Sequence, residues 1–251
     1  MNRRILLFTI TLFIVNLAAY SQCIVVTNAA SYREDFETNN GNWLIKGTGS
    51  DWAWGKPAKS LINTAGSGQK CWITGGLTNP TYNAGQRSWI ESPCFDFTNL
   101  LYPYFSFKVY WETENNYDGA GLQFSTDNGS TWQNIGTDGA PPNCLVTNWF
   151  NNPSINNLSQ QNIKNGWSGT VKSSSGSCNG GNGISGWRTA SHTMLNLAGK
   201  PSVKFRFTFG AGTTCNTYDG FALDDIFIGN APPNAADFTT TCLAQIERAH
   251  V

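Results

Sequence analysis

Histidine, charged residues and long hydrophobic runs are all scarce in this chain of 251 residues. Only two histidines occur, His192 and His250, which leaves no HExxH zinc site and no cluster of cysteine and histidine zinc ligands. The sequence also contains no GxSxG nucleophile elbow. Charged residues make up 13% of the chain, and 16 basic residues balance 16 acidic ones. This balance of charge gives no indication of binding to nucleic acid, and we expect none.

The one sustained apolar stretch lies at the N-terminus. Two arginines precede an apolar run over residues 5–19, and small or polar residues follow it. This order is typical of a secretory signal peptide, and the run is too short to span a bilayer comfortably. We therefore expect cleavage after residues 1–21, a secreted or outer-surface location, and no transmembrane helix in the mature chain. The alternatives are a retained membrane anchor and a lipid anchor on Cys23, although Tyr20-Ser21-Gln22 fits a lipobox poorly.

What remains after cleavage is acidic and rich in turn-forming and aromatic residues. The segment 1–21 contains two arginines and no acids, so the mature chain has 14 basic and 16 acidic residues and a net charge of −2. Glycine, asparagine, serine, threonine and aromatic residues are plentiful, which is the composition of a turn-rich β protein. About 230 residues suffice for one large β domain.

Short runs of alternating polar and apolar residues predict the strands. Residues 104–111 and 203–209 alternate most clearly, and residues 70–74 and 88–92 add two further strands. Asn128-Gly129 is a hairpin signal, because both residues tolerate positive φ angles. Many short strands separated by turn signals predict an all-β fold, an antiparallel β-sandwich or jelly roll.

Seven cysteines in an exported chain predict disulfides, and the odd number leaves one unpaired. Cys144 and Cys178 bracket a polar loop and form one candidate pair. Cys71 and Cys94 lie near two predicted strands and form the other. The sequence alone does not determine the connectivity, so both pairs are hypotheses.

Residues 136–186 form a long polar segment without a sustained period. Such a segment inside a compact domain is either a functional loop or poorly ordered. Most of the ten tryptophans are expected to fill the core or cover its edges. Trp149 and Trp167 lie in this loop, which makes them the candidates for contact with a ligand.

The strongest candidate for catalysis is a cluster of carboxylates at the end of a predicted strand. Glu112, Glu114 and Asp118 lie there among aromatic residues, and glycosidases use two carboxylates that flank a sugar. A strand followed by an acidic loop is nevertheless common, and nothing in the sequence fixes the separation of these carboxylates. His192 is interpreted as a polar strand residue rather than a general base. We therefore do not expect the chain to be an enzyme.

Several motifs, taken in order, resemble the MAM domain, an extracellular adhesion-type jelly roll. They are Asp35-Phe36-Glu37, Asp51-Trp52-Ala53-Trp54-Gly55, Ile90-Glu91-Ser92-Pro93, Val203 to Phe209, and Ala222-Leu223-Asp224-Asp225-Ile226. The Trp-x-Trp-Gly-Lys-Pro block and the segment from Asp118 to Trp132 are similar to MAM-like regions of exported proteins from Bacteroidetes-type bacteria. The resemblance covers residues 33–229, after a lead-in over residues 22–32. Residues 230–251 read as a linker followed by a segment that resembles the start of a PKD-type domain.

The resemblance also implies a structural calcium site. In MAM-like jelly rolls, acids from the first strand, the following Asp-Trp loop and the last strand gather around a cation. These positions correspond here to Glu37, Asp51 and one or both of Asp224 and Asp225, and carboxylate oxygens suit calcium. Because adjacent strand residues point to opposite faces, we expect one of the last two to hold the ion, preferably Asp225, unless the strand is bulged. Without the resemblance, these acids read as solvated turn and edge residues.

Together these features predict a non-catalytic extracellular binding or adhesion module that calcium stabilises and that belongs to a larger surface protein. Its partner would be an extracellular protein or a glycan. Two alternatives remain, an accessory domain of a secreted hydrolase such as a protease or glycosidase, and a carbohydrate-binding module. Fold resemblance alone does not choose the ligand.

Overall fold

A computed structural model describes residues 22–137, 145–161, 164–170, 178 and 183–231. The strands are β1 (Ile24–Val25), β2 (Tyr32–Glu34), β3 (Leu44–Thr48), β4 (Ala53–Gly55), β5 (Cys71–Ile73), β6 (Arg87–Glu91), β7 (Phe95–Asp96), β8 (Pro103–Glu112), β9 (Gly119–Ser125), β10 (Gln133–Asn134), β11 (Trp167–Ser168), β12 (Arg188–Thr193), β13 (Lys204–Gly210) and β14 (Gly220–Asn230). Two short 3-10 helices, η1 (Asn156–Gln161) and η2 (Leu195–Leu197), complete the described part. No helix in that part is both long and apolar enough to cross a membrane.

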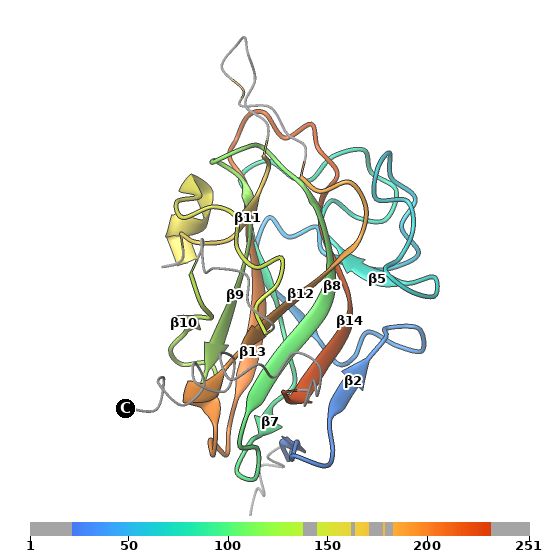
Figure 1. The fold of residues 1–251 in the computed structure, drawn as a ribbon. Helices are drawn as coiled ribbons and strands as arrows, with labels where there is room; N and C mark the ends of the chain where they lie inside the picture. The colour runs from blue at the N-terminus through green and yellow to red at the C-terminus, as the bar shows by residue number, and fades with distance from the viewer. Residues whose placement is uncertain (1–21, 138–144, 162–163, 171–177, 179–182, 232–251) are drawn as a thin grey trace, which may run out of the picture.

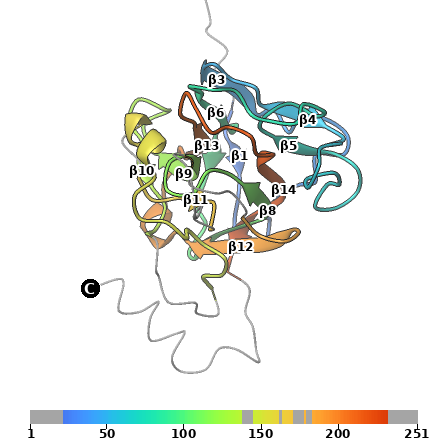
Figure 2. The same cartoon turned by 90° about the horizontal axis from the view of Figure 1, so that it is seen from above.

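Two antiparallel sheets form the layers of a sandwich (Figures 1 and 2). The first sheet has the order β10-β9-β13-β6-β3, with β11 paired to β9. The second has the order β12-β8-β14-β5-β4, with β2 paired to β14. β1 and β7 form a separate, small parallel pair, and Phe95 of β7 packs into the core beside Phe205. The predicted β-sandwich or jelly-roll class is thus confirmed.

The core lies between the sheets and is rich in aromatic rings. Along β8 every second residue is buried, and the residues between them are partly exposed on the outer face. Rings from β8 meet rings from β13, with centroids 5.0 Å apart for Phe105 and Phe205 and 4.8 Å apart for Phe107 and Phe207. Edge-to-face contacts at these distances are favourable for aromatic pairs. The alternation in the sequence therefore corresponds to core and surface, as expected for half-buried strands.

The long polar segment folds back onto the sandwich and places its tryptophans in the core. Trp149 is 7% exposed and Trp167 is fully buried. The Trp167 ring lies 5.5 Å from that of Phe107, and its Nε1 donates to the backbone oxygen of Asn148. The prediction that these two tryptophans contact a ligand is therefore wrong, because neither offers a ring face to solvent. Pairing of β11 with β9 draws this part of the loop inward.

Both predicted disulfides are also wrong. Cys94 bonds to Cys23, and Cys178 bonds to Cys215, whereas Cys71 is a buried free thiol. Parallel pairing of β1 with β7 sets Ile24 opposite Phe95, and this register brings Cys23 beside Cys94. Cys144 lies outside the described residues, but Cys178 is not its partner. Because the sulfur of Cys23 is in a disulfide, it is not available for a lipid anchor.

Candidate functional site

Residues 62–70, which we call the strap, cross the outer face of the second sheet. The backbone oxygen of Thr64 accepts a hydrogen bond of 2.9 Å from Trp187 Nε1, just before β12. Further along, the Gly66 oxygen accepts one of 2.8 Å from Lys108 Nζ on β8. A Cβ atom on Gly66 would lie 3.0 Å from the Lys108 side chain, so the backbone rests directly on the sheet.

The strap covers only one half of this outer face. Beneath it is a small second apolar cluster of Ile62, Cys71, Ile73 and Ala222, against which Ala65, Leu77, Tyr110 and Trp187 pack. This cluster removes apolar surface from water and so stabilises the packing of the strap against the sheet. The other half of the face, along the first residues of β8, is not under the strap.

Three of the predicted metal ligands hold the strap. Glu37 Oε1 accepts hydrogen bonds of 2.8 and 2.7 Å from the backbone nitrogens of Gln69 and Lys70. Asp224 Oδ2 accepts one of 2.9 Å from the nitrogen of Ser67, and Asp225 Oδ1 accepts one of 2.7 Å from the hydroxyl of Ser67. These are charge-assisted hydrogen bonds, which are stronger than neutral ones. The structure therefore brings Glu37, Asp224 and Asp225 together around one segment.

A bulge in β14 allows both adjacent aspartates to serve the strap. The register with β8 shifts between Asp224 and Phe227, and Asp225 has a φ angle of 50°. In a regular strand these two side chains would point to opposite faces. The extra residue of a bulge bends the strand and redirects a side chain, which is the exception that the sequence left open.

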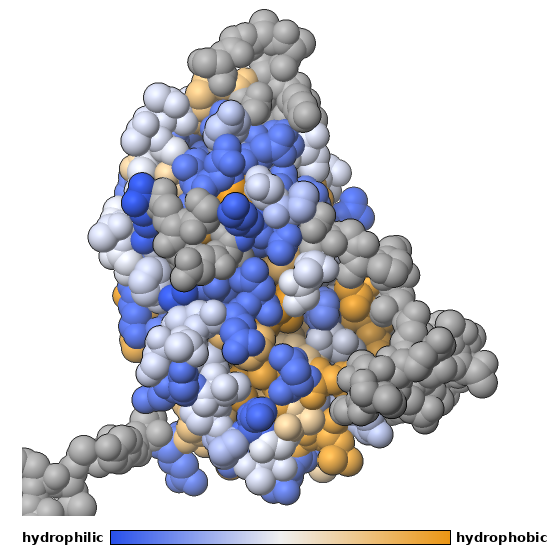
Figure 3. Space-filling model, turned by 90° about the vertical axis from the view of Figure 1, so that its left-hand side faces the viewer, coloured by the Kyte–Doolittle hydropathy of each residue, from blue (hydrophilic) through white to orange (hydrophobic). Residues whose placement is uncertain are grey.

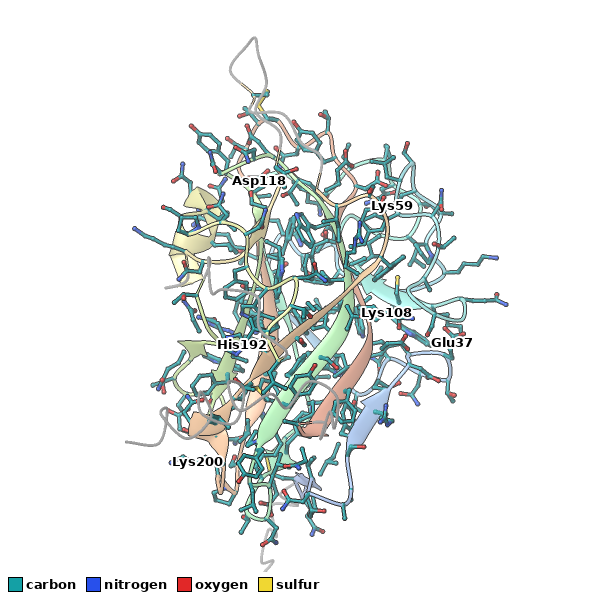
Figure 4. The ribbon with its side chains drawn as sticks, viewed as in Figure 1. Glu37, Lys59, Lys108, Asp118, His192 and Lys200 are labelled. Carbon is teal, nitrogen blue, oxygen red and sulfur yellow. A yellow bond between two sulfur atoms is a disulfide. The ribbon has the colours of Figure 1, made fainter. Side chains whose placement is uncertain are left out.

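Burial and charge distinguish the three carboxylates. Asp224 is fully buried, and burial is the main cause that raises its pKa to about 7. Asp225 forms an ion pair of 2.8 Å with Lys108. Hydrogen bonds from Lys70 and Gln69 lower the pKa of Glu37. Figure 4 shows Lys108 and Glu37 on the same side of the molecule.

Asp51, the fourth predicted ligand, serves a different loop. Its Oδ2 accepts a hydrogen bond of 2.6 Å from the nitrogen of Asn83, and its backbone oxygen accepts one from Gly76. Among the described residues, no three of the four predicted acids bring their ligand oxygens within 4.8 Å of one another. The donors suit calcium in chemistry, since Glu37, Asp224 and Asp225 offer hard oxygens at one segment. Backbone N–H groups and the Lys108 ammonium are their partners in this arrangement.

An open groove of about 690 Å³ lies beside the strap, on the uncovered half of the outer face. It is lined by Arg33, Glu34, Asp35, Tyr104, Ser106, Asp225, Ile226 and Phe227. The Arg33 guanidinium lies 4.5 Å from the centroid of the Phe227 ring, and the Tyr104 ring meets that ring edge-on at 6.2 Å. The groove thus combines an aromatic wall with charges of both signs. The outward residues of β8 were the sequence signal for this face, but the sequence did not show that β2 lies alongside.

The three carboxylates considered for a glycosidase do not flank a common cleft. Asp118 is fully buried and accepts hydrogen bonds of 2.8 Å from Tyr82, Asn157 and Gly212. Glu114 is 4% exposed. Glu112 alone lines a groove, of about 420 Å³, where it accepts a hydrogen bond from the nitrogen of Asp219. Burial raises the pKa of both Asp118 and Glu112.

The other side chains that could act in catalysis or bind a metal are packed against neighbours or bonded to each other. His192 packs against Trp149 with ring centroids 4.9 Å apart, and burial lowers the pKa of its imidazole. Among the described residues, the sole group of three metal-type ligands is Glu114 with Cys178 and Cys215, whose sulfurs are already bonded to each other.

No known protein-family profile matches the chain. Over 125 residues, 49% of the chain, it is 28% identical to Bacillopeptidase F of Bacillus subtilis strain 168, and it spans only 8% of that protein. The K1 cleaved adhesin domain of Lys-gingipain from Porphyromonas gingivalis W83 superposes with a TM-score of 0.44 and 15% identity, over 80% of this chain and 99% of that domain. The CBM22-1 xylan-binding domain of Xyn10C from Paenibacillus barcinonensis gives a TM-score of 0.39 and 8% identity, over 85% of this chain and all of that domain.

Proposed function

We propose that the chain is a non-catalytic extracellular binding module that holds a partner protein in the open groove beside the strap. The observation that carries this proposal is the groove itself, about 690 Å³ in volume and built on the sheet rather than on loops. A site on rigid strands loses little conformational freedom when a partner binds. The module would act in adhesion as part of a larger surface protein, and a MAM-like identity for residues 33–229 belongs to the same proposal.

The chemistry of the groove favours a polypeptide segment of mixed charge. Arg33 stacks on Phe227 and can present its remaining N–H groups to a carboxylate of the partner. Glu34 and Asp35 can pair with basic side chains, and Tyr104 supplies apolar contact with a polar end. Aromatic and arginine side chains are the residues that contribute most at protein interfaces.

An extracellular location is proposed on two grounds. The apolar run over residues 5–19, which lies outside the described residues, has the order of a signal peptide. The two disulfides between described cysteines are typical of proteins that fold in oxidising compartments.

Calcium at the strap is a further part of the proposal. Glu37, Asp224 and Asp225 would hold the ion, which would supply positive charge that fastens the strap to the last strand. The support is the convergence of these three carboxylates on residues 66–70. Lys108 competes for Asp225, so binding would have to displace that ammonium.

A second candidate function, an accessory domain of a secreted hydrolase, is favoured by the partial similarity to Bacillopeptidase F. In that case the chain would have no activity by itself and would position a separate peptidase. Incubation of the purified chain with casein should release no peptides under either candidate. Peptide release that survives further purification would contradict both.

Binding to a panel of immobilised extracellular proteins, namely fibronectin, fibrinogen and collagen, tests the groove by surface plasmon resonance. We expect Arg33→Glu and Phe227→Ala each to weaken binding to a panel member at least tenfold. The matched control is Arg87→Glu, an exposed arginine on the opposite sheet. The proposal fails if no panel member binds, or if the control loses as much affinity as the groove variants.

A further inference from the structure

A second, uncharged pocket lies where the loop between β8 and β9 meets the segment before η1. We call it the asparagine pocket, and it has a volume of about 390 Å³. It is lined by Asn116, Tyr117, Asn152, Pro153, Ser154 and Asn156. This volume is at the lower end of the range for small-molecule sites. Neither the proposed groove nor the strap shares a residue with it.

Hydrogen bonds join the two segments and make the pocket a fixed shape. The backbone oxygens of Asn116 and Tyr117 accept hydrogen bonds of 3.0 and 2.9 Å from the nitrogens of Asn156 and Asn157. Asn152 is 6% exposed, and its Nδ2 donates to the side-chain oxygen of Asn116 over 2.6 Å. The nitrogen of Asn116 donates in turn to the Ser168 hydroxyl. The wall is therefore formed before any ligand arrives.

The backbone at this loop turns one aromatic ring outward and one carboxylate inward. Asn116 has a φ angle of 65°, a left-handed conformation that asparagine tolerates well. The next residue, Tyr117, keeps 40% of its surface exposed, whereas Asp118 is fully buried and hydrogen-bonded. The acidic group of this loop is thereby kept out of the pocket, and the aromatic ring remains at its mouth.

The lining offers hydrogen-bonding groups and an aromatic face but no formal charge. Amide groups both donate and accept hydrogen bonds, and the Ser154 and Tyr117 hydroxyls do the same. A charged ligand would lose hydration without gaining a counter-charge here. A neutral sugar matches the lining, because its C–H face can pack on the Tyr117 ring while its hydroxyls exchange hydrogen bonds with the Asn116 amide nitrogen and the Ser154 and Tyr117 hydroxyls. The Asn152 amide is already occupied, since its nitrogen donates to Asn116 and its oxygen accepts from the Ser154 nitrogen. Figure 3, seen from the side of η1, shows mainly hydrophilic side chains over the upper part of the molecule.

We propose that the asparagine pocket binds a neutral sugar unit of a glycan, independently of the protein partner in the open groove. A single sugar has few atoms to contribute, so its dissociation constant should be on the order of 1 mM. A polysaccharide presents many copies of the unit, and its apparent affinity rises through multivalency.

Affinity electrophoresis in native gels tests this site with defined probes. The gels contain laminarin, xylan or soluble starch as neutral polysaccharides, and polygalacturonate as the acidic contrast. We expect slower migration in at least one neutral gel and unchanged migration in polygalacturonate. Tyr117→Ala should abolish the retardation, whereas Tyr102→Ala, which removes a tyrosine that is 42% exposed, should preserve it.

The outcomes separate this site from the open groove. Absence of retardation in every neutral gel overturns the proposal, as does retardation that persists in Tyr117→Ala or that Tyr102→Ala removes equally. Far-ultraviolet circular dichroism and an unchanged melting temperature would show that Tyr117→Ala is folded. Arg33→Glu should leave glycan retardation intact, and Tyr117→Ala should leave binding to immobilised protein intact, so either site can fail without the other.

Discussion

Loss of the disulfide between Cys23 and Cys94 should weaken the fold substantially. The bond closes a segment with a sequence separation of 71 residues. In the chain-entropy treatment, such a loop restricts the unfolded state by about 4 kcal/mol at 25 °C. Apart from this disulfide, the two residues of β1 and the buried side chain of Val26 are what fix this end of the chain to the sandwich. We therefore expect the double variant Cys23→Ala with Cys94→Ala to fold with a melting temperature roughly 10 °C lower.

Urea denaturation of the oxidised protein measures this loss, with Cys71→Ala as the matched control. Cys71 is a buried cysteine outside both disulfides, so its replacement should cost only about 1 kcal/mol. Peptide mapping under non-reducing conditions should find Cys23 linked to Cys94. A double variant that loses less than the control would refute the reasoning, and so would a mature chain in which Cys23 is free or carries a lipid.

Three further predictions concern charge, calcium and the core. Burial lowers the pKa of Lys59 to about 8, below its unfolded-state pKa of about 10.4. Between those pH values the unfolded state binds this proton and the native state does not, so the free energy of unfolding rises with pH. Relative to Lys59→Met, the wild type should gain about 2 kcal/mol between pH 7 and pH 10 in urea titrations, and no difference would show that the ammonium is not desolvated. If calcium binds at the strap, the melting temperature in 5 mM CaCl₂ should be higher than in EDTA, and Asp225→Ala should remove this difference. Equal melting temperatures of the wild type in the two conditions would rule the ion out. Trp167→Ala should cost about 4 kcal/mol because the ring is fully buried, whereas Tyr117→Ala should cost less than about 0.5 kcal/mol, and similar losses for both would contradict their different burial.

The candidate site could be predicted only in part from the sequence. The resemblance to MAM-like domains grouped Glu37 with Asp224 and Asp225, and the structure does place these three around one segment. It did not predict that this segment is the strap or that Lys108 lies among them. The same resemblance grouped Asp51 with them, but its hydrogen bonds lead to the loop at Asn83.

The sequence by itself determined the sandwich class and several of its core strands, because the alternation of polar and apolar residues is local and has the period of a strand. β8 follows that pattern in sequence and in burial, whereas β13 alternates in sequence but is buried on both faces, with Arg206 and Thr208 covered as well. Asn128-Gly129 has the positive φ angles that its turn requires. Only the tertiary structure decided the disulfide partners, the burial of Trp149 and Trp167, and the common direction of Asp224 and Asp225. These features depend on register between segments far apart in the chain, and a shift of one residue would change every such contact.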